Sequence, residues 1–302
     1  MPFQFLNYVP GEYIALFIAA IWACASILYS RAGKYIPAME LNLLKGILAL
    51  VLVTFVLIIQ RGFSTSLPPL AIVLLLLSGA LGIGLGDTAY LHALQDIDPR
   101  KTTLIKMIAP PTAGLIAWIF MGEALNGLAW VGILLILGGV AWVVTESPNG
   151  TNGHPLNPRG IGMAVFAALT EAGAVVLARA ALTLTDISPI WSTFMRLAGG
   201  IIIVVVTLVI RGKPLGKWMK LPETPKIAVT AFSAIFMGTF MGIWLQQVVL
   251  QTTPAGIAQT LFATTPLFVL PLAALLGEKI SLRAVFGVFV SIAGMAILFI
   301  IK

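Results

Sequence analysis

Apolar residues along this chain form long runs, separated by short polar or charged stretches. A helix needs roughly 20 mostly apolar residues to cross a bilayer, and about ten runs reach that length. Because the connections are short, little chain remains for a soluble domain. The pattern therefore predicts an all-α integral membrane protein with ten transmembrane helices. The runs centre on residues 12–30, 39–60, 70–94, 101–121, 125–145, 160–181, 189–210, 227–250, 255–275 and 282–301.

Composition supports this class. Hydrophobic residues make up 59% of the chain, charged residues only 10%, and the mean hydropathy is +1.03, whereas about a quarter of the residues of an average soluble domain are charged. The net charge of +7 would suggest nucleic acid as a partner of a soluble protein. Here basic loops facing the cytoplasm explain it better. We therefore expect the lipid bilayer, and no nucleic acid, as a partner.

Two stretches, Gly82 to Glu123 and Gly238 to Glu278, carry the same landmarks in the same order. Each opens with Gly-x-x-x-Gly, turns at a proline, has a second proline in the next apolar run and closes on Gly-Glu. The chain is therefore a tandem repeat. The landmarks are Gly82, Gly86, Pro99, Pro111 and Gly122-Glu123 in the first copy and Gly238, Gly242, Pro254, Pro266 and Gly277-Glu278 in the second.

The repeat divides the chain into residues 1–146, a Pro-, Gly- and Asn-rich linker over 147–158, and residues 159–302. Each half contains five predicted spans. Because five is an odd number, the second half must cross the membrane in the opposite sense, so the repeats are inverted. Inverted repeats with broken helices are typical of secondary transporters, whose substrate site lies near the midplane. Pro111 and Pro266 are the expected helix-breaking residues.

Each half has a proline about twelve residues before its Gly-Glu pair. A basic residue lies early in the second and the seventh span, Lys45 and Arg196. With this arrangement the chain resembles the EamA type of the drug/metabolite transporter superfamily. The resemblance implies that spans 1–4 and 6–9 surround a central cavity while spans 5 and 10 lie outside. It also implies alternating-access transport of small metabolites, often export of amino acids, through the cell membrane.

Ionisable residues inside predicted spans are costly and mark candidate sites. Asp87 and Glu171 are the deep carboxylates. Lys106 is a cation about 9 Å into its span, and Arg179, two turns beyond Glu171, could pair with Glu171 or with a substrate carboxylate. Structural ion pairs are the alternative for both carboxylates, and snorkelling to the interface is the alternative for Lys106. Aromatic, amide and hydroxyl side chains complete the candidate cavity lining. These are Trp22, Ser26, Tyr29, Tyr90, Trp244, Gln246 and Gln259.

This mixture of charges predicts a small zwitterionic or carboxylate substrate, with amino acids first and other organic anions as an alternative. Coupling to protons through Glu171 or Asp87 is one option; exchange without protons is another. With one cysteine and two histidines far apart, we predict no metal, no cofactor and no catalytic residues, hence no enzyme. A channel or a lipid flippase remains the competing class. Ten helices can enclose a cavity unaided, so we expect a monomer.

The distribution of basic loops bears on orientation. Most Lys and Arg residues outside the spans lie on the face opposite the termini, five of them between Arg211 and Lys226. The positive-inside rule then places both termini outside the cytoplasm, whereas relatives of the family it resembles commonly have both inside.

Overall fold

The computed structural model describes residues 9–60, 67–97, 99–145, 157–212, 215–275 and 281–300. Within these ranges the chain is helical, without strands, and ten helices are long and apolar enough to cross a membrane. The predicted all-α class with ten spans is confirmed. Most of the predicted linker, residues 147–156, and the Gly277-Glu278 pair lie outside the described residues.

The two halves contain matching series of elements, in which the third and fourth spans of each half are divided into shorter pieces. In the first half they are α1 (Gly11–Ala32), α2 (Ala38–Ile59), α3 (Pro69–Gly79), η3 (Ala80–Gly86), α4 (Asp87–Asp96), α5 (Pro99–Lys106), α6 (Ala109–Met121) and α7 (Gly127–Thr145). In the second half they are α8 (Pro158–Leu184), α9 (Pro189–Arg211), η4 (Lys217–Lys220), α10 (Thr224–Ala234), η5 (Ile235–Met241), α11 (Gly242–Thr252), α12 (Ala255–Phe262), α13 (Thr265–Leu275) and α14 (Leu282–Ile300).

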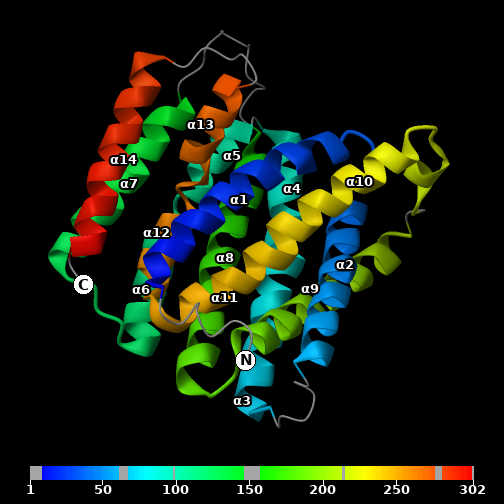
Figure 1. The fold of residues 1–302 in the computed structure, drawn as a ribbon, viewed down its shortest axis with the longest axis horizontal. Coiled ribbons are helices and arrows are strands. Elements are labelled where there is room, and N and C mark those ends of the chain that lie inside the picture. Colours follow the sequence, from blue (N-terminus) through cyan, green and yellow to red (C-terminus); the bar gives the residue numbers. More distant parts are fainter. Residues whose placement is uncertain are drawn as a thin grey trace.

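The halves interlock rather than sit side by side (Figure 1). Helix α1 packs against α10, η5, α11, α12 and α13 of the second half, and α8 packs against α3, η3, α4, α5 and α6 of the first. The second helices of the two halves, α2 and α9, pack against each other. A site between the halves would therefore be lined by helices of both.

Helices α7 and α14 pair at the edge of the molecule (Figure 1). Glycines make their close approach possible. A Cβ atom on Gly287 would lie 2.8 Å from the carbonyl oxygen of Gly139, and one on Gly294 would lie 2.7 Å from that of Gly132. Small residues of this kind let transmembrane helices pack backbone to backbone. This peripheral pair is the expected position of spans 5 and 10.

The fourth and ninth spans are interrupted just before their prolines. Helix α5 ends at Lys106 and α6 begins at Ala109 with Pro110 in its first turn, while α12 ends at Phe262 and α13 begins at Thr265. A proline in the first turn of a helix removes only an N–H that would have no intrahelical partner. The new helix therefore starts at the proline, and the break precedes it.

A π-helical turn lies at the same place in the third and eighth spans, as η3 and η5. Such turns disturb the regular hydrogen-bond ladder and are frequent at functional sites. In each turn a side chain from another helix donates to one carbonyl: Asn42 Nδ2 to Ile83 O at 3.2 Å, and Trp22 Nε1 to Gly238 O at 2.8 Å. The glycines of the two repeated stretches thus lie in or next to π-helical turns, and each turn is held by a side chain from another helix.

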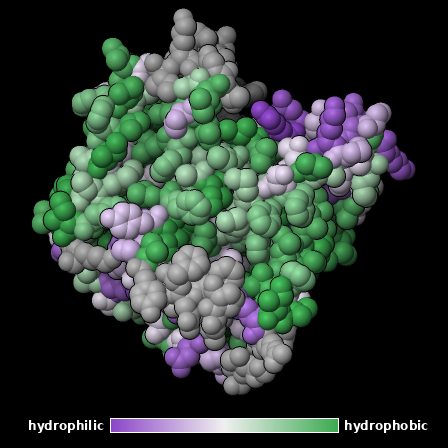
Figure 2. Space-filling model, viewed as in Figure 1, coloured by the Kyte–Doolittle hydropathy of each residue, from purple (hydrophilic) through white to green (hydrophobic). Residues whose placement is uncertain are grey.

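The surface matches a membrane environment. Figure 2 shows apolar residues over most of one face, with hydrophilic residues gathered beside the start of α10. This hydrophilic corner contains the exposed residues Lys217, Lys220, Glu223 and Lys226. Seven of the ten spans precede this corner, so it lies on the face opposite the N-terminus. All ten spans precede the C-terminus, which therefore lies on the same face as the N-terminus.

Candidate functional site

Two ion pairs lie among the inner helices, the first of them within the first half of the chain. Lys45 Nζ of α2 donates to Asp87 Oδ2 of α4 at 2.5 Å. Asp87 is the first residue after the π-helical turn η3, which directs it toward α2. Lys45 thus points inward to a carboxylate instead of extending to the membrane interface.

The second pair joins the halves. Lys106 Nζ, at the end of α5, lies 2.7 Å from Glu171 Oε2, near the middle of α8. Gln259 Nε2 of α12 donates to the other oxygen, Glu171 Oε1, at 2.9 Å. Lys106 also stands over the ring of Tyr90, 4.4 Å from its centroid, within range of a cation–π interaction. Both oxygens of Glu171 are therefore engaged.

Arg196 of α9 completes this group. Its Nη1 donates to Gln246 Oε1 of α11 at 2.9 Å, and it interacts electrostatically with both Asp87 and Glu171. Asp87 also interacts electrostatically with Lys106 and with Tyr29. We refer to Lys45, Asp87, Tyr90, Lys106, Glu171, Arg196, Gln246 and Gln259 as the central polar cluster.

Parts of the central polar cluster are open to water. The side chains of Asp87 and Glu171 are 35% and 34% exposed, and that of Lys106 is 27% exposed. The two pairs join different helices, Lys45 of α2 to Asp87 of α4 and Lys106 of α5 to Glu171 of α8. Carboxylates, cations and amides are thus brought together in one part of the protein.

A third ion pair lies further along α8, toward the face of the termini. Arg179 Nε donates to Glu123 Oε1 at 2.6 Å, and Arg179 Nη1 donates to Leu250 O at 2.7 Å. Glu123 Oε2 accepts from the backbone N–H of Ala255 at 3.0 Å, at the start of α12. Arg179 and Glu123 are only 12% and 15% exposed. We call this set the terminal-face pair.

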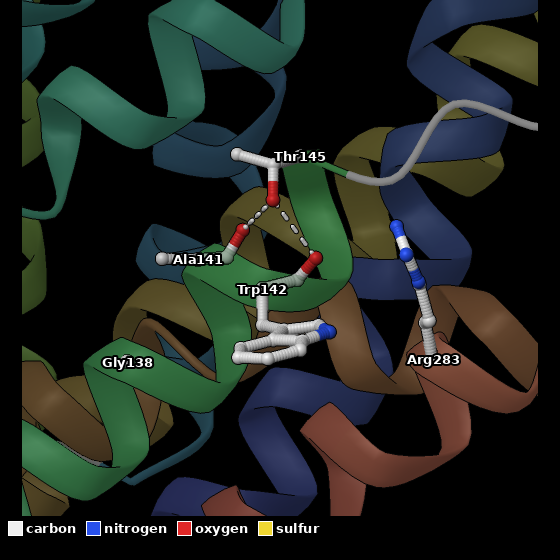
Figure 3. Close-up of a pocket in the computed structure, with 5 residues that line it drawn as sticks. All are labelled: Gly138, Ala141, Trp142, Thr145 and Arg283. Carbon is white, nitrogen blue, oxygen red and sulfur yellow. Dashed lines mark hydrogen bonds between the residues drawn. The ribbon is translucent and has the colours of Figure 1, made fainter.

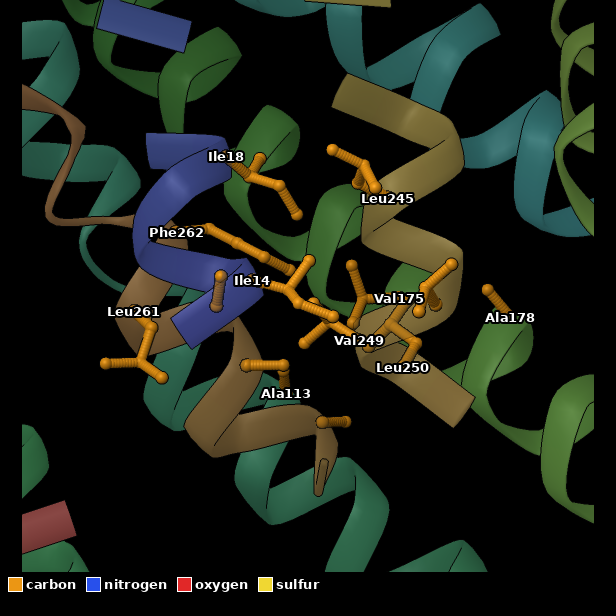
Figure 4. Close-up of a cluster of buried hydrophobic side chains, with 14 of the residues drawn as sticks. Ile14, Ile18, Ala113, Val175, Ala178, Leu245, Val249, Leu250, Leu261 and Phe262 are labelled. Carbon is orange, nitrogen blue, oxygen red and sulfur yellow. The ribbon is translucent and has the colours of Figure 1, made fainter. Parts of the chain in front are cut away.

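A cluster of buried apolar side chains includes neighbours of the terminal-face pair (Figure 4). Its members come from helices of both halves, α1, α6, α8, α11 and α12, and each is less than a tenth exposed. Ala178 precedes Arg179 in the chain, and Leu250 O accepts a hydrogen bond from Arg179. The helices are therefore closely packed beside Arg179. The apolar seal comprises Ile14, Ile18, Ala113, Val175, Ala178, Leu245, Val249, Leu250, Leu261 and Phe262.

Several predicted site residues make contacts outside the central polar cluster. Trp22 donates to the π-helical turn η5, and Ser26 Oγ donates to Ala23 O of its own helix at 2.7 Å. The hydroxyl groups of Tyr29 and Thr239 are 2.5 Å apart. Trp244 packs against Phe240 with ring centroids 6.0 Å apart. Arg179 pairs with Glu123 rather than with Glu171.

Sequence reasoning did not place Lys45, Arg196 and Glu123 among the site residues. Depth along a helix was the only available signal for the first two, and a lysine or arginine near a helix end is usually explained by snorkelling. Glu123 follows Gly122, which adopts φ +70° at the end of α6, so the Gly-Glu motif looked like a turn. Its long-range partner had no local signature.

Among the described residues, no group of three or more His, Cys, Asp or Glu side chains is arranged to hold a metal ion.

A pocket of about 370 Å³ lies between α7 and α14 (Figure 3). Its lining, Gly138, Ala141, Trp142, Thr145 and Arg283, includes no predicted site residue. It is peripheral to the central polar cluster.

Comparisons with known proteins agree with the doubled architecture. The model of the EamA-like transporter family matches residues 9–145 and again residues 158–300. A solved structure titled "Crystal structure of protein" is similar with a TM-score of 0.78 at 14% sequence identity, over 96% of each chain. At that identity the likeness concerns the fold alone. No curated protein matches the sequence.

Proposed function

The chain belongs to the EamA-like transporter family, and from this premise we propose that it carries small zwitterionic or carboxylate metabolites, amino acids first, through the plasma membrane. Members of this family are transporters of small molecules in the membrane rather than enzymes. The observation that supports the substrate class is the central polar cluster. Its carboxylates, cations and amides offer partners for both ends of a zwitterion.

The contrast between the two ends of α8 supports alternating access. The central polar cluster is reached by water, whereas the terminal-face pair and the apolar seal close the other side. A carrier exposes its site to one side at a time, and an open channel needs a continuous polar path. We propose that the described state is open on the side away from the termini and that separation of Arg179 from Glu123 opens the opposite side.

Export follows from this geometry if the basic loops lie in the cytoplasm. The positive-inside rule places the face opposite the termini in the cytoplasm, so the described state would load cytoplasmic substrate. A reporter fused to the C-terminus tests the orientation. Activity only in the cytoplasm would reverse the assignment, and the described state would then face outward.

The substrate proposal is tested by counterflow in proteoliposomes. We expect saturable exchange of at least one of the twenty L-amino acids or of a simple carboxylate such as lactate, and no exchange of glucose. Exchange of glucose alone would overturn the proposed substrate class. Flux that rises without saturation would indicate a channel instead of a carrier.

Proton coupling would use the same carboxylates. Protonation of Glu171 removes its attraction for Lys106, and protonation of Asp87 does the same for Lys45. We expect Glu171→Gln or Asp87→Asn to abolish accumulation driven by a pH gradient, and Asp87→Asn to retain exchange without a gradient. Wild-type pH-driven accumulation by both variants would exclude coupling through these groups.

A further inference from the structure

The central polar cluster carries one positive charge without a counter-ion. Lys45 is paired with Asp87, and Lys106 is paired with Glu171. Among the described residues, no carboxylate lies within 4.0 Å of Arg196. The cluster thus holds three cations and two carboxylates, and the excess charge belongs to Arg196.

Arg196 is also under-bonded. The residue is only 5% exposed, its one side-chain hydrogen bond among the described residues goes to Gln246, and its Nε has no partner. An ionised group removed from water is strongly unfavourable unless it is paired and hydrogen-bonded. A buried guanidinium with a free N–H therefore needs an additional acceptor.

Two glycines let the third span pack closely against Arg196. A Cβ atom on Gly79 would collide with the backbone of Arg196, and one on Gly82 would come within 3.7 Å of Arg196 Nη2. Both glycines lie in the third span, at and before the π-helical turn η3. They let this span approach α9 while placing no side chain over the guanidinium.

Gln259 has a buried acceptor without a donor, whereas Arg196 has a buried donor without an acceptor. This residue is 3% exposed, and its Nε2 donates to Glu171, a carboxylate that can only accept. The amide oxygen Oε1 therefore points elsewhere and is buried without a donor. Arg196 interacts electrostatically with the same Glu171. A buried donor without an acceptor and a buried acceptor without a donor thus belong to two residues that both interact with Glu171.

We propose that Arg196 and Gln259 are the two ends of a subsite for an α-amino acid zwitterion. Arg196 Nε–H donates to the substrate carboxylate, and Gln259 Oε1 and Glu171 accept from the substrate ammonium group. This proposal rests on the transport function proposed above and identifies the residues that recognise each end. The substrate carboxylate then neutralises the excess charge of the cluster.

The experiment measures ligand-induced thermal stabilisation of the purified full-length protein. The probes are the twenty L-amino acids individually, the amide derivative of each stabilising amino acid, the corresponding amine without a carboxyl group, and acetate, propionate and lactate. The proteins are the wild type, Arg196→Gln, Arg196→Lys and the surface control Arg159→Gln, whose side chain is 67% exposed. A ligand that binds only the folded state raises its apparent stability.

For the wild type and Arg159→Gln we expect stabilisation by at least one amino acid and none by its amide or amine. Arg196→Gln should bind that amino acid about tenfold or more weakly, as loss of a charge-assisted hydrogen bond predicts. Arg196→Lys should retain part of the affinity. Without ligand, Arg196→Gln should melt no lower than the wild type, because an unpaired buried charge has been removed.

The possible failures point to different conclusions. Equal amino acid binding by the wild type and Arg196→Gln overturns the subsite and leaves the transport function standing. A lower melting temperature of ligand-free Arg196→Gln assigns Arg196 a structural role and also overturns it. Stabilisation only by amines, or by no carboxylate at all, overturns both the subsite and the proposed substrate class. Stabilisation by simple carboxylates alone keeps the role of Arg196 but overturns that of Gln259.

Discussion

Helix α8 carries two ion pairs with the same chemistry and opposite surroundings. Glu171 and Arg179 are eight residues apart on this helix, so about 12 Å separates them along its axis. Glu171 meets Lys106 among amides, with side chains 34% and 27% exposed. Arg179 meets Glu123 among apolar side chains, with side chains 12% and 15% exposed. Both pairs join the first half of the chain to the second.

The difference indicates that burial, rather than the presence of an ion pair, distinguishes a ligand-binding site from a closed region between the helices. At the terminal-face pair both charges are satisfied by each other and by backbone groups, so a ligand has nothing to add. In the central polar cluster, water reaches the charges and two buried polar atoms have no partner. Exchange of partners is feasible there and strongly opposed at the other end of α8.

The largest contrast should appear in chemical accessibility. In a Cys24→Ser background, Tyr90→Cys should react with a membrane-impermeant maleimide about tenfold or more faster than Ala178→Cys, because the buried position reacts only after the helices open. Labelling is measured by mass shift on permeabilised vesicles, so that the reagent reaches both faces of the membrane. Full labelling of Ala178→Cys after denaturation is the control. Equal rates in the folded protein would contradict a closed terminal face.

Stability should respond most to loss of the terminal-face pair. Glu123→Gln leaves Arg179 buried without a counter-ion, and breaking a buried pair in this way costs about 3–5 kcal/mol. The double variant Glu123→Met, Arg179→Met removes both charges and should recover most of the loss. Unfolding in detergent measures both. A single variant as stable as the wild type would show that the pair does not hold the helices together.

The pair in the central polar cluster should behave in the opposite way. Glu171→Gln should lower the apparent stability by about 1 kcal/mol or less, because ion pairs whose side chains are partly exposed contribute little to stability. Amino acid counterflow should fall by about tenfold or more, the equivalent of ~1.4 kcal/mol of binding. If Glu171→Gln were as destabilising as Glu123→Gln, the two pairs would not differ in role.

The smallest effect is expected at the hydrogen bond that joins Tyr29 to Thr239 of η5. Thr239→Val keeps the side-chain shape and removes the hydroxyl group, so about 1 kcal/mol of stability should be lost. The tyrosine hydroxyl should then be left without its partner. A Tyr29→Phe, Thr239→Val double variant should cost little more than either single change, since both remove the same bond.

Sequence alone predicted the ten spans, the doubled order and the depth of Asp87 and Glu171, because hydrophobic run length and position along a run are local properties. The partners of the charges were not predictable in this way. Lys106 meets Glu171 and Arg179 meets Glu123 across the boundary between the halves, and no spacing in one chain fixes such contacts. Burial distinguishes Arg196 from a snorkelling arginine, and burial depends on neighbouring helices.

The π-helical turns also lacked a clear signal, since Gly-x-x-x-Gly equally indicates ordinary helix packing. The helix breaks were expected at Pro111 and Pro266, and the structure places each break just before a proline, at residues 107–108 and 263–264. A proline is compatible with the first turn of a helix. The sequence therefore identified the broken spans and left the position of each break undetermined by a few residues.

The π-helical turn η3 sets the angular phase of the helix that follows it. A π turn accommodates one residue more than an α turn, and each residue of an α-helix advances by about 100° around the axis. Deleting one residue from η3 would therefore rotate α4 by about a quarter to a third of a revolution and swing Asp87 away from Lys45. One inserted residue is thus enough to aim a membrane-embedded carboxylate, and inserting or deleting residues here offers a way to re-aim it without changing any side chain.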